Sequence, residues 1–266
     1  MSLDYIRDIV LGLIQGLTEF LPVSSAAHLI LLPRLLGWSD QGLEVDVAAH
    51  VGSLCAVIYY FRGELKGMLA GAYHSRFKLA DPQSRYLYFL ILATLPIAIT
   101  GWLASDIVAT QLRSPLVIAS ATIIFALVLW IADYSGKKNR GEGSLNWKDA
   151  LLIGCFQVLA LIPGTSRSGI TITAGLIAGL DRQSAARFSF LLAVPTILLA
   201  GAYEGLKLLM TADQIDWTTM ATVTLASFIT AALTIHYFLK FLSWTGMLPY
   251  IIYRLILGCL LVFLFV

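Results

Sequence analysis

The stretch Pro163-Gly164-Thr165-Ser166-Arg167-Ser168-Gly169 interrupts an apolar segment that runs from about residue 147 to 180. A second stretch, Leu21-Pro22-Val23-Ser24-Ser25, interrupts another apolar segment, from about residue 6 to 36. Each half of a broken segment has only about 12–16 residues, fewer than the roughly 20 that a membrane-spanning helix needs. We therefore expect two re-entrant helix pairs, each of which enters and leaves a membrane on one side.

The composition places these segments in a membrane protein. Of the 266 residues, 58% are hydrophobic and only 13% are charged, against about 25% charged residues in soluble domains. A soluble domain of this length could not bury so much apolar surface. Soluble enzymes, disordered proteins and nucleic-acid-binding proteins are therefore excluded. The net charge of +2 is too small to indicate a polyanionic partner.

Six further apolar stretches are long enough to cross a bilayer. They lie near residues 44–62, 86–105, 114–133, 184–207, 217–239 and 247–266. Lys and Arg concentrate in the connections 62–85 and 134–149, which should be cytoplasmic. The other connections hold mainly acids, with Arg113 the basic exception: Asp40, Glu44, Asp46, Asp106, Asp213 and Asp216. Six alternating spans then place both termini on the outer side.

The two broken segments resemble each other. Gly12-x-x-Gln15 precedes the first break as Gly154-x-x-Gln157 precedes the second, and three predicted spans follow each break. Because three is odd, the second half must enter the membrane from the opposite side. We predict one membrane domain, 1–266, whose halves (approximately 1–134 and 147–266) form an inverted repeat joined by the basic cytoplasmic loop 134–149. Such repeats place their site near the midplane, where the halves meet.

Polar and ionisable side chains are concentrated at the two breaks. Placing such groups inside a membrane costs free energy, so they are functional candidates by default. The first break carries Gln15, Glu19, Ser24, Ser25 and His28; the second carries Gly164, Thr165, Ser166, Arg167, Ser168 and Thr171. After each proline a new half-helix can begin, capped by Ser24 or Ser25 and by Thr165 or Ser166. If the tips meet, two positive helix ends and the Arg167 guanidinium converge. This arrangement suits an anion with several oxygens, and phosphate fits best.

The same cluster can carry acid–base chemistry. His28 follows Ser25 by three residues and Ser24 by four, so an imidazole and a hydroxyl can share a helix face, as an activated hydroxyl requires. Glu19 can orient His28 or hold a divalent ion against phosphates. Each residue also has a purely structural interpretation: the serines as caps, and Glu19 with Arg167 as an ion pair.

Three other ionisable residues lie outside the cluster and are isolated in the sequence: Glu204, His236 and Arg254. For these we expect interfacial positions or pairing rather than chemistry.

The segment from Gln15 to His28 resembles the undecaprenyl-pyrophosphate phosphatase family, also called the bacitracin-resistance proteins. Its first motif, (Glu/Gln)-x-x-x-Glu leading into Pro-Val-Ser-Ser and a His, is matched by Gln15, Glu19, Ser24, Ser25 and His28. Its second motif, Pro-Gly-x-Ser-Arg-Ser-x-x-Thr, is matched by Pro163, Gly164, Ser166, Arg167, Ser168 and Thr171. Ala26-Ala27 stands where the family often has Thr-Gly. Gln in place of Glu at position 15 removes one possible metal carboxylate.

The resemblance implies an all-α integral membrane phosphatase with about six transmembrane helices and two re-entrant pairs. It implies hydrolysis of the lipid substrate undecaprenyl pyrophosphate to undecaprenyl phosphate and inorganic phosphate, which recycles the lipid carrier of bacterial cell-wall synthesis and confers bacitracin resistance. The expected cofactor is a divalent cation, Mg²⁺ or Ca²⁺. The expected location is the bacterial inner membrane, among membrane lipids, with the site open to the periplasm. A homodimer is possible.

The expected roles follow from this chemistry. Arg167 clamps the pyrophosphate, Ser25 attacks the outer phosphorus or positions a water, and His28 transfers the proton. Glu19, helped by Gln15, orients His28 or binds the metal. The remaining expected substrate-binding residues are Ser24, Gly164, Thr165, Ser166, Ser168 and Thr171.

The main alternative is a transporter or flippase for polyprenyl phosphate, because inverted repeats with broken helices are typical of transporters. The pair of Ser25 and His28 favours an enzyme. The other class of membrane lipid phosphatases uses a histidine nucleophile and needs Pro-Ser-Gly-His, with a His and an Asp downstream of Ser-Arg. No such pattern follows Ser166-Arg167.

Overall fold

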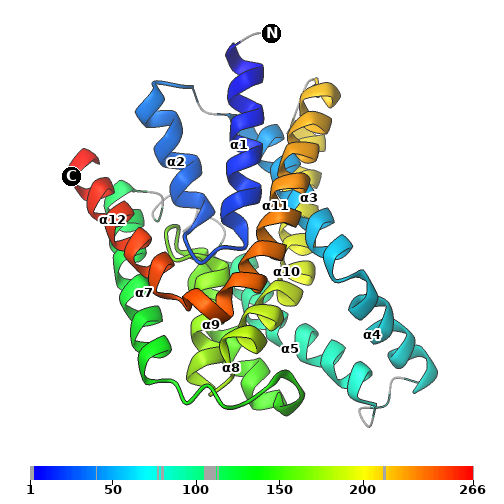
Figure 1. The fold of residues 1–266 in the computed structure, drawn as a ribbon. Helices are drawn as coiled ribbons and strands as arrows, with labels where there is room; N and C mark the ends of the chain where they lie inside the picture. The colour runs from blue at the N-terminus through cyan, green and yellow to red at the C-terminus, as the bar shows by residue number, and fades with distance from the viewer. Residues whose placement is uncertain are drawn as a thin grey trace.

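The computed structural model describes residues 3–39, 41–76, 78, 81–104, 112, 114–211 and 214–265, and these ranges are helical without a named strand. Figure 1 shows the arrangement of the helices. In chain order they are α1 (Leu3–Glu19), α2 (Ser25–Leu36), α3 (Gly42–Tyr60), α4 (Arg62–His74), α5 (Pro82–Leu103), α7 (Pro115–Ser135), η1 (Glu142–Ser144), α8 (Trp147–Gln157), η2 (Val158–Leu161), α9 (Arg167–Ile177), α10 (Arg182–Thr211), α11 (Trp217–Thr245) and α12 (Leu248–Phe265).

Six of these helices are long and apolar enough to cross a membrane: α3, α5, α7, α10, α11 and α12. They confirm the six predicted spans, with ends displaced by a few residues. The helix α4 was not predicted, because its stretch of the connection 62–85 is too polar to span a bilayer. It is amphipathic, and it buries Met68 and Ala72. The predicted outer residues Asp40, Asp106, Arg113 and Asp213 lie outside the described residues.

Both predicted helix breaks are present. The first separates α1 from α2, and the second separates α8 and η2 from α9. Ser24 and Ser166 are the N-caps, and they accept hydrogen bonds from Ala27 N at 3.4 Å and Gly169 N at 3.2 Å. Their φ angles are 72° and 69°, a region that residues other than glycine rarely adopt. The two tips therefore share one unusual backbone conformation.

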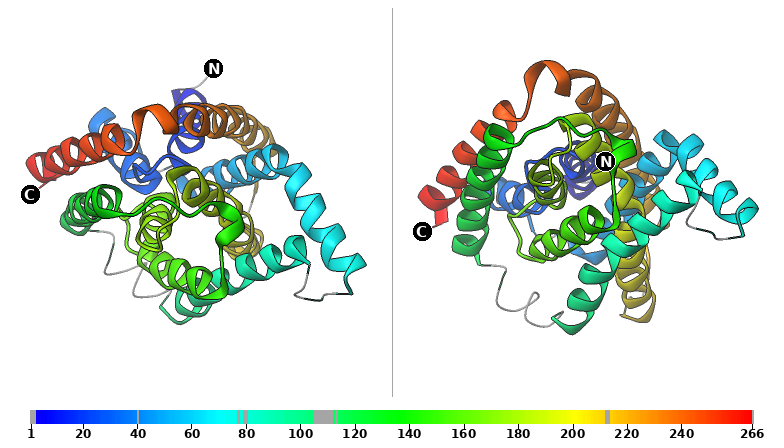
Figure 2. Two further views of the ribbon diagram at one scale, coloured as in Figure 1. Left: turned by 60° about the horizontal axis from the view of Figure 1, so that its bottom comes forward. Right: turned by 90° about the horizontal axis from the view of Figure 1, so that it is seen from below.

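Each broken segment packs against a span from the other half of the chain. A Cβ added to Gly12 of α1 would lie 2.9 Å from the Val223 carbonyl of α11, and one added to Gly154 of α8 would lie 2.6 Å from the Ala93 carbonyl of α5. Glycine is thus what lets these helix backbones touch. Figure 2 shows α8 and α9 enclosed by longer helices, with α7 and α12 side by side at one edge. The inverted orientation of the halves stays a prediction.

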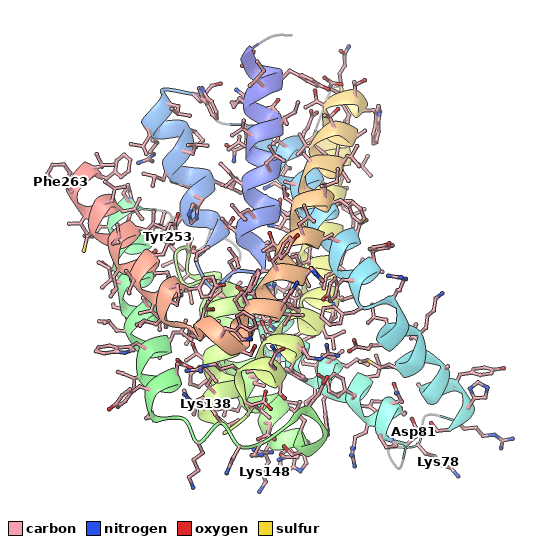
Figure 3. All side chains as sticks on the ribbon, viewed as in Figure 1. Lys78, Asp81, Lys138, Lys148, Tyr253 and Phe263 are labelled. Carbon is pink, nitrogen blue, oxygen red and sulfur yellow. The ribbon has the colours of Figure 1, made fainter. Side chains whose placement is uncertain are left out.

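The basic connections share one end of the molecule. Lys78, Lys138 and Lys148 lie at the bottom of Figure 3, and the N-terminus lies at the opposite end. Helix α12 ends beside α2, where the Arg34 guanidinium lies 5.3 Å from the ring centre of Phe265. The orientation of these two ends in a membrane stays a prediction.

Candidate functional site

The tips of the two broken segments meet in the interior, which fulfils the condition that the sequence analysis set for an anion site. The Ser168 hydroxyl donates to the Leu21 carbonyl at 2.8 Å, and the Arg167 guanidinium lies 3.3 Å from the Glu19 carboxylate. Residues Ser168 to Leu176 of α9 are all buried, so the surrounding helices hold this tip in place. The contact joins residues that are about 150 positions apart in the chain.

Glu19 stands at the centre of this contact. Its Oε2 accepts hydrogen bonds from Gln15 Nε2 and from Ser25 Oγ, both at 3.0 Å. Its Oε1 accepts from Arg167 Nε at 3.4 Å and Nη2 at 3.3 Å. The Glu19 side chain is only 8% exposed. The carboxylate therefore pairs with the guanidinium through one oxygen and orients the hydrogen of the Ser25 hydroxyl through the other.

Arg167 is the first residue of α9, so its charge adds to the positive end of that helix. Its Nη1 also donates to the Ser189 carbonyl of α10 at 3.1 Å. Thr171, one turn further on, lies behind it: the Thr171 hydroxyl donates to the Arg167 carbonyl and pairs with the Ser189 hydroxyl at 2.7 Å. Thr171 thus links α9 to α10 and stabilises the backbone position of Arg167.

His28 does not make the expected pairs with Ser25 and Glu19. Its Nδ1 bonds to the Ser24 carbonyl at 2.8 Å and its Nε2 to the Tyr253 hydroxyl at 2.5 Å. Because a carbonyl only accepts, Nδ1 carries the hydrogen and Nε2 accepts from the tyrosine. Tyr253 lies beside the lower end of α2 in Figure 3. The expectation that Glu19 orients His28 is corrected: in this structure the Ser25 hydroxyl is directed to Glu19.

Arg254 also lies elsewhere than the sequence predicts. It lies in α12 and is fully buried, and its Nη2 donates to the Gly164 and Thr165 carbonyls at 3.0 and 2.8 Å. The expected interfacial position is therefore wrong. Tyr253 was missed as well. The sequence did hold a signal for Arg254: it is an arginine well inside a predicted span, where an ionisable residue is a functional candidate by default.

Several buried polar atoms at the tips lack a protein partner in the part of the chain that the structure describes. They are Gln15 Oε1, Thr165 Oγ1, Arg254 Nε and Arg254 Nη1. Ser25 and His28 are partly exposed, so the site is accessible from outside the protein beside these two residues. Two arginines and one glutamate leave a formal excess of one positive charge. The excess positive charge, together with the positive end of α9, suits an anion that carries several oxygens.

The tips offer few ligands for a divalent cation. Among the described residues no three or more His, Cys, Asp or Glu side chains form a metal-binding group. Glu19 supplies one carboxylate, and Gln15 Oε1 is a buried acceptor without a partner. Mg²⁺ is commonly held by one or two carboxylates together with substrate phosphates. The oxygens present therefore fit a cation shared with a phosphate ligand, and they do not form a cage made by protein alone.

The fold and the site define a polytopic α-helical membrane protein with a candidate anion site where the two tips meet. The family described as "Bacitracin resistance protein BacA" matches residues 8–260, and the chain belongs to this family. Two relatives are 54% identical to it: "Undecaprenyl-diphosphatase 2" of Stutzerimonas stutzeri, over 99% of both chains, and "Undecaprenyl-diphosphatase" of Thioalkalivibrio sulfidiphilus, over 99% of this chain and 100% of the relative. "Undecaprenyl-diphosphatase" of Nitrosococcus oceani is 53% identical, also over 99% and 100%.

Proposed function

We propose that the chain is an undecaprenyl-diphosphatase of the bacterial inner membrane. It hydrolyses undecaprenyl pyrophosphate to undecaprenyl phosphate and inorganic phosphate, recycles the lipid carrier of cell-wall synthesis and confers bacitracin resistance. The observation that carries the proposal is the Ser25 hydroxyl, held by Glu19 beside the Arg167 guanidinium at the meeting tips. Full-length relatives with this activity in their names support it.

The geometry supports transfer of the outer phosphoryl group to Ser25. Arg167 and the positive end of α9 bind the phosphate oxygens and stabilise the charge that they carry during transfer. A bond forms between Ser25 Oγ and the outer phosphorus as the bond from that phosphorus to the bridging oxygen breaks. Undecaprenyl phosphate leaves with the electron pair. The Ser25 hydrogen passes to Glu19 Oε2 along the existing 3.0 Å hydrogen bond.

Water completes the cycle. Its oxygen bonds to the phosphorus of the phosphoserine as the phosphorus–Oγ bond breaks, and Glu19, now protonated, returns its hydrogen to Ser25 Oγ. Both hydrogens of the attacking water stay on the oxygens of the phosphate that forms. Inorganic phosphate is released and Glu19 is again a carboxylate. A divalent cation would be held by Glu19 and Gln15 Oε1, and it would offset charge on the pyrophosphate.

The polyprenyl tail would lie among membrane lipids on the side where Ser25 and His28 are exposed. We place the site toward the periplasm, together with both termini, because the basic connections lie at the opposite end (Figure 3) and basic connections stay cytoplasmic.

The test is phosphate release from a defined polyprenyl pyrophosphate by purified protein, with and without chelator. Wild type should release phosphate, Ser25→Ala should release almost none, and Ser135→Ala should match wild type. Ser135 is the matched control because its hydroxyl is exposed and, in the part of the chain that the structure describes, donates to the Ile131 carbonyl of its own helix α7. Wild type that binds the lipid without releasing phosphate would replace this function by transport of a polyprenyl phosphate.

A further inference from the structure

Arg254 of α12 is a buried cation whose charge no described carboxylate offsets. It is fully buried, and the ion pairs among the described residues do not include it. Two of its nitrogens, Nε and Nη1, have no hydrogen-bond partner there. A buried charge with unmade hydrogen bonds is costly. We therefore expect Arg254 to have a role in the candidate site next to it.

The third nitrogen, Nη2, reaches the loop that leads into α9. It donates to the carbonyls of Gly164 and Thr165 at 3.0 and 2.8 Å. This loop is strained at Ser166, because its φ of 69° is unusual for a residue with a side chain. Two charged hydrogen bonds to consecutive carbonyls stabilise the loop in this conformation. The loop in turn sets where α9 begins and where Arg167 points.

A second contact places the guanidinium against the first turn of α9. A Cβ added to Gly169 would lie 2.8 Å from Arg254 Nη1 and 3.2 Å from Ser166 Oγ. Glycine at 169 therefore makes room for the guanidinium beside the N-cap. Positive charge is concentrated here, from Arg254, Arg167 and the N-terminal end of α9. Among the described residues, Glu19 is the one carboxylate in contact with either arginine.

We propose that Arg254 is a positioning residue for phosphate recognition, an inference that rests on the proposed function. It holds the second tip in its binding conformation through the Gly164 and Thr165 carbonyls. It also contributes a buried positive charge that a multiply charged phosphate offsets. Since the side chain is fully buried, it acts through the loop and through its electric field rather than by touching the substrate.

Two substitutions separate these contributions. Arg254→Lys keeps the charge, and Arg254→Gln keeps N–H donors for the carbonyls without the charge. Arg62→Gln is the matched control, because Arg62 is exposed on α4 and, among the described residues, its guanidinium interacts with the carbonyl and the ring of the neighbouring Tyr59. For each purified protein, thermal unfolding with increasing inorganic phosphate gives a phosphate Kd. Steady-state hydrolysis of the polyprenyl pyrophosphate gives kcat and KM separately.

We expect Arg254→Gln to weaken phosphate binding and raise KM by about tenfold or more, with a smaller change in kcat. Arg254→Lys should keep most of the phosphate affinity, and Arg62→Gln should match wild type. Wild-type phosphate affinity in Arg254→Gln would overturn the proposal, as would equal losses in the Lys and Gln variants. If Arg254→Gln does not fold, the Lys variant decides: a phosphate Kd more than 100-fold weaker than wild type overturns the role of the charge.

The phosphate titration does not depend on turnover, so the two proposals can fail separately. Wild type that binds phosphate but releases none from the lipid would refute the hydrolase, and the Arg254 comparison would still stand. Wild type that hydrolyses the lipid while Arg254→Gln keeps its KM would refute only the role of Arg254.

Discussion

Replacing Glu19 with Gln keeps the shape of the side chain and removes its charge. The carboxylate accepts hydrogen bonds from Gln15, Ser25 and Arg167, and both members of its ion pair are nearly buried, with 8% and 11% of the side chain exposed. Removing one partner of a buried pair costs about 3–5 kcal/mol, because the other charge is left uncompensated. Arg167 keeps the Ser189 carbonyl, so we expect a loss near the lower figure, about 3 kcal/mol.

The effect on turnover should be larger than the effect on folding. A positioned proton acceptor contributes about 10²–10⁴-fold to a rate, and the Ser25 hydrogen points to Glu19. We therefore expect phosphate release by Glu19→Gln to fall by at least 10²-fold. Phosphate release and unfolding in detergent are measured on the same preparation. Inorganic phosphate at about 100 times its Kd should restore up to about 2.7 kcal/mol, because it pairs with the freed Arg167.

The double variant Glu19→Gln/Arg167→Gln tests whether the charges are coupled. If they are, it loses less stability than the sum of the two single variants, because no unpaired charge remains at that contact. Additive losses would show that the ion pair contributes no coupling. Phosphate release by Glu19→Gln within about twofold of wild type, in a protein of unchanged stability, would refute the assignment of Glu19 as the proton acceptor.

Two further predictions concern packing and the histidine. Gly154→Ala should cost about 1–3 kcal/mol of stability, because the added methyl would meet the Ala93 carbonyl. The control Gly205→Ala should be neutral or stabilising, because nothing lies within 4 Å of a Cβ at that position. Equal effects of the two variants on thermal unfolding would contradict the close approach of α8 and α5. His28→Asn should slow phosphate release less than Glu19→Gln does, and the reverse order in the same assay would return the proton transfer to His28.

The sequence by itself determined the membrane class, the six spans, both helix breaks and most of the site residues. These features are local: span length and hydropathy follow from consecutive residues, and a proline followed by serines ends one helix and caps the next within a few positions. The motif residues Glu19, Ser25 and Arg167 could be named because each lies in such a break. The amphipathic helix α4 escaped detection because its stretch is too polar to resemble a span.

Only the tertiary structure decided which partner each site residue takes. Helical spacing put His28 within reach of Ser25, but the turn between α1 and α2 brings the Ser25 hydroxyl to Glu19 instead, and His28 bonds to Tyr253 of α12. Arg254 looked isolated because its carbonyl partners are about 90 positions away in the chain. Packing between distant helices sets such contacts, and no local pattern encodes them. The sequence thus determines where the charged residues lie along the chain. The packing of α9 against α10, and the contact of α12 with the loop before α9, decide which groups these charges contact.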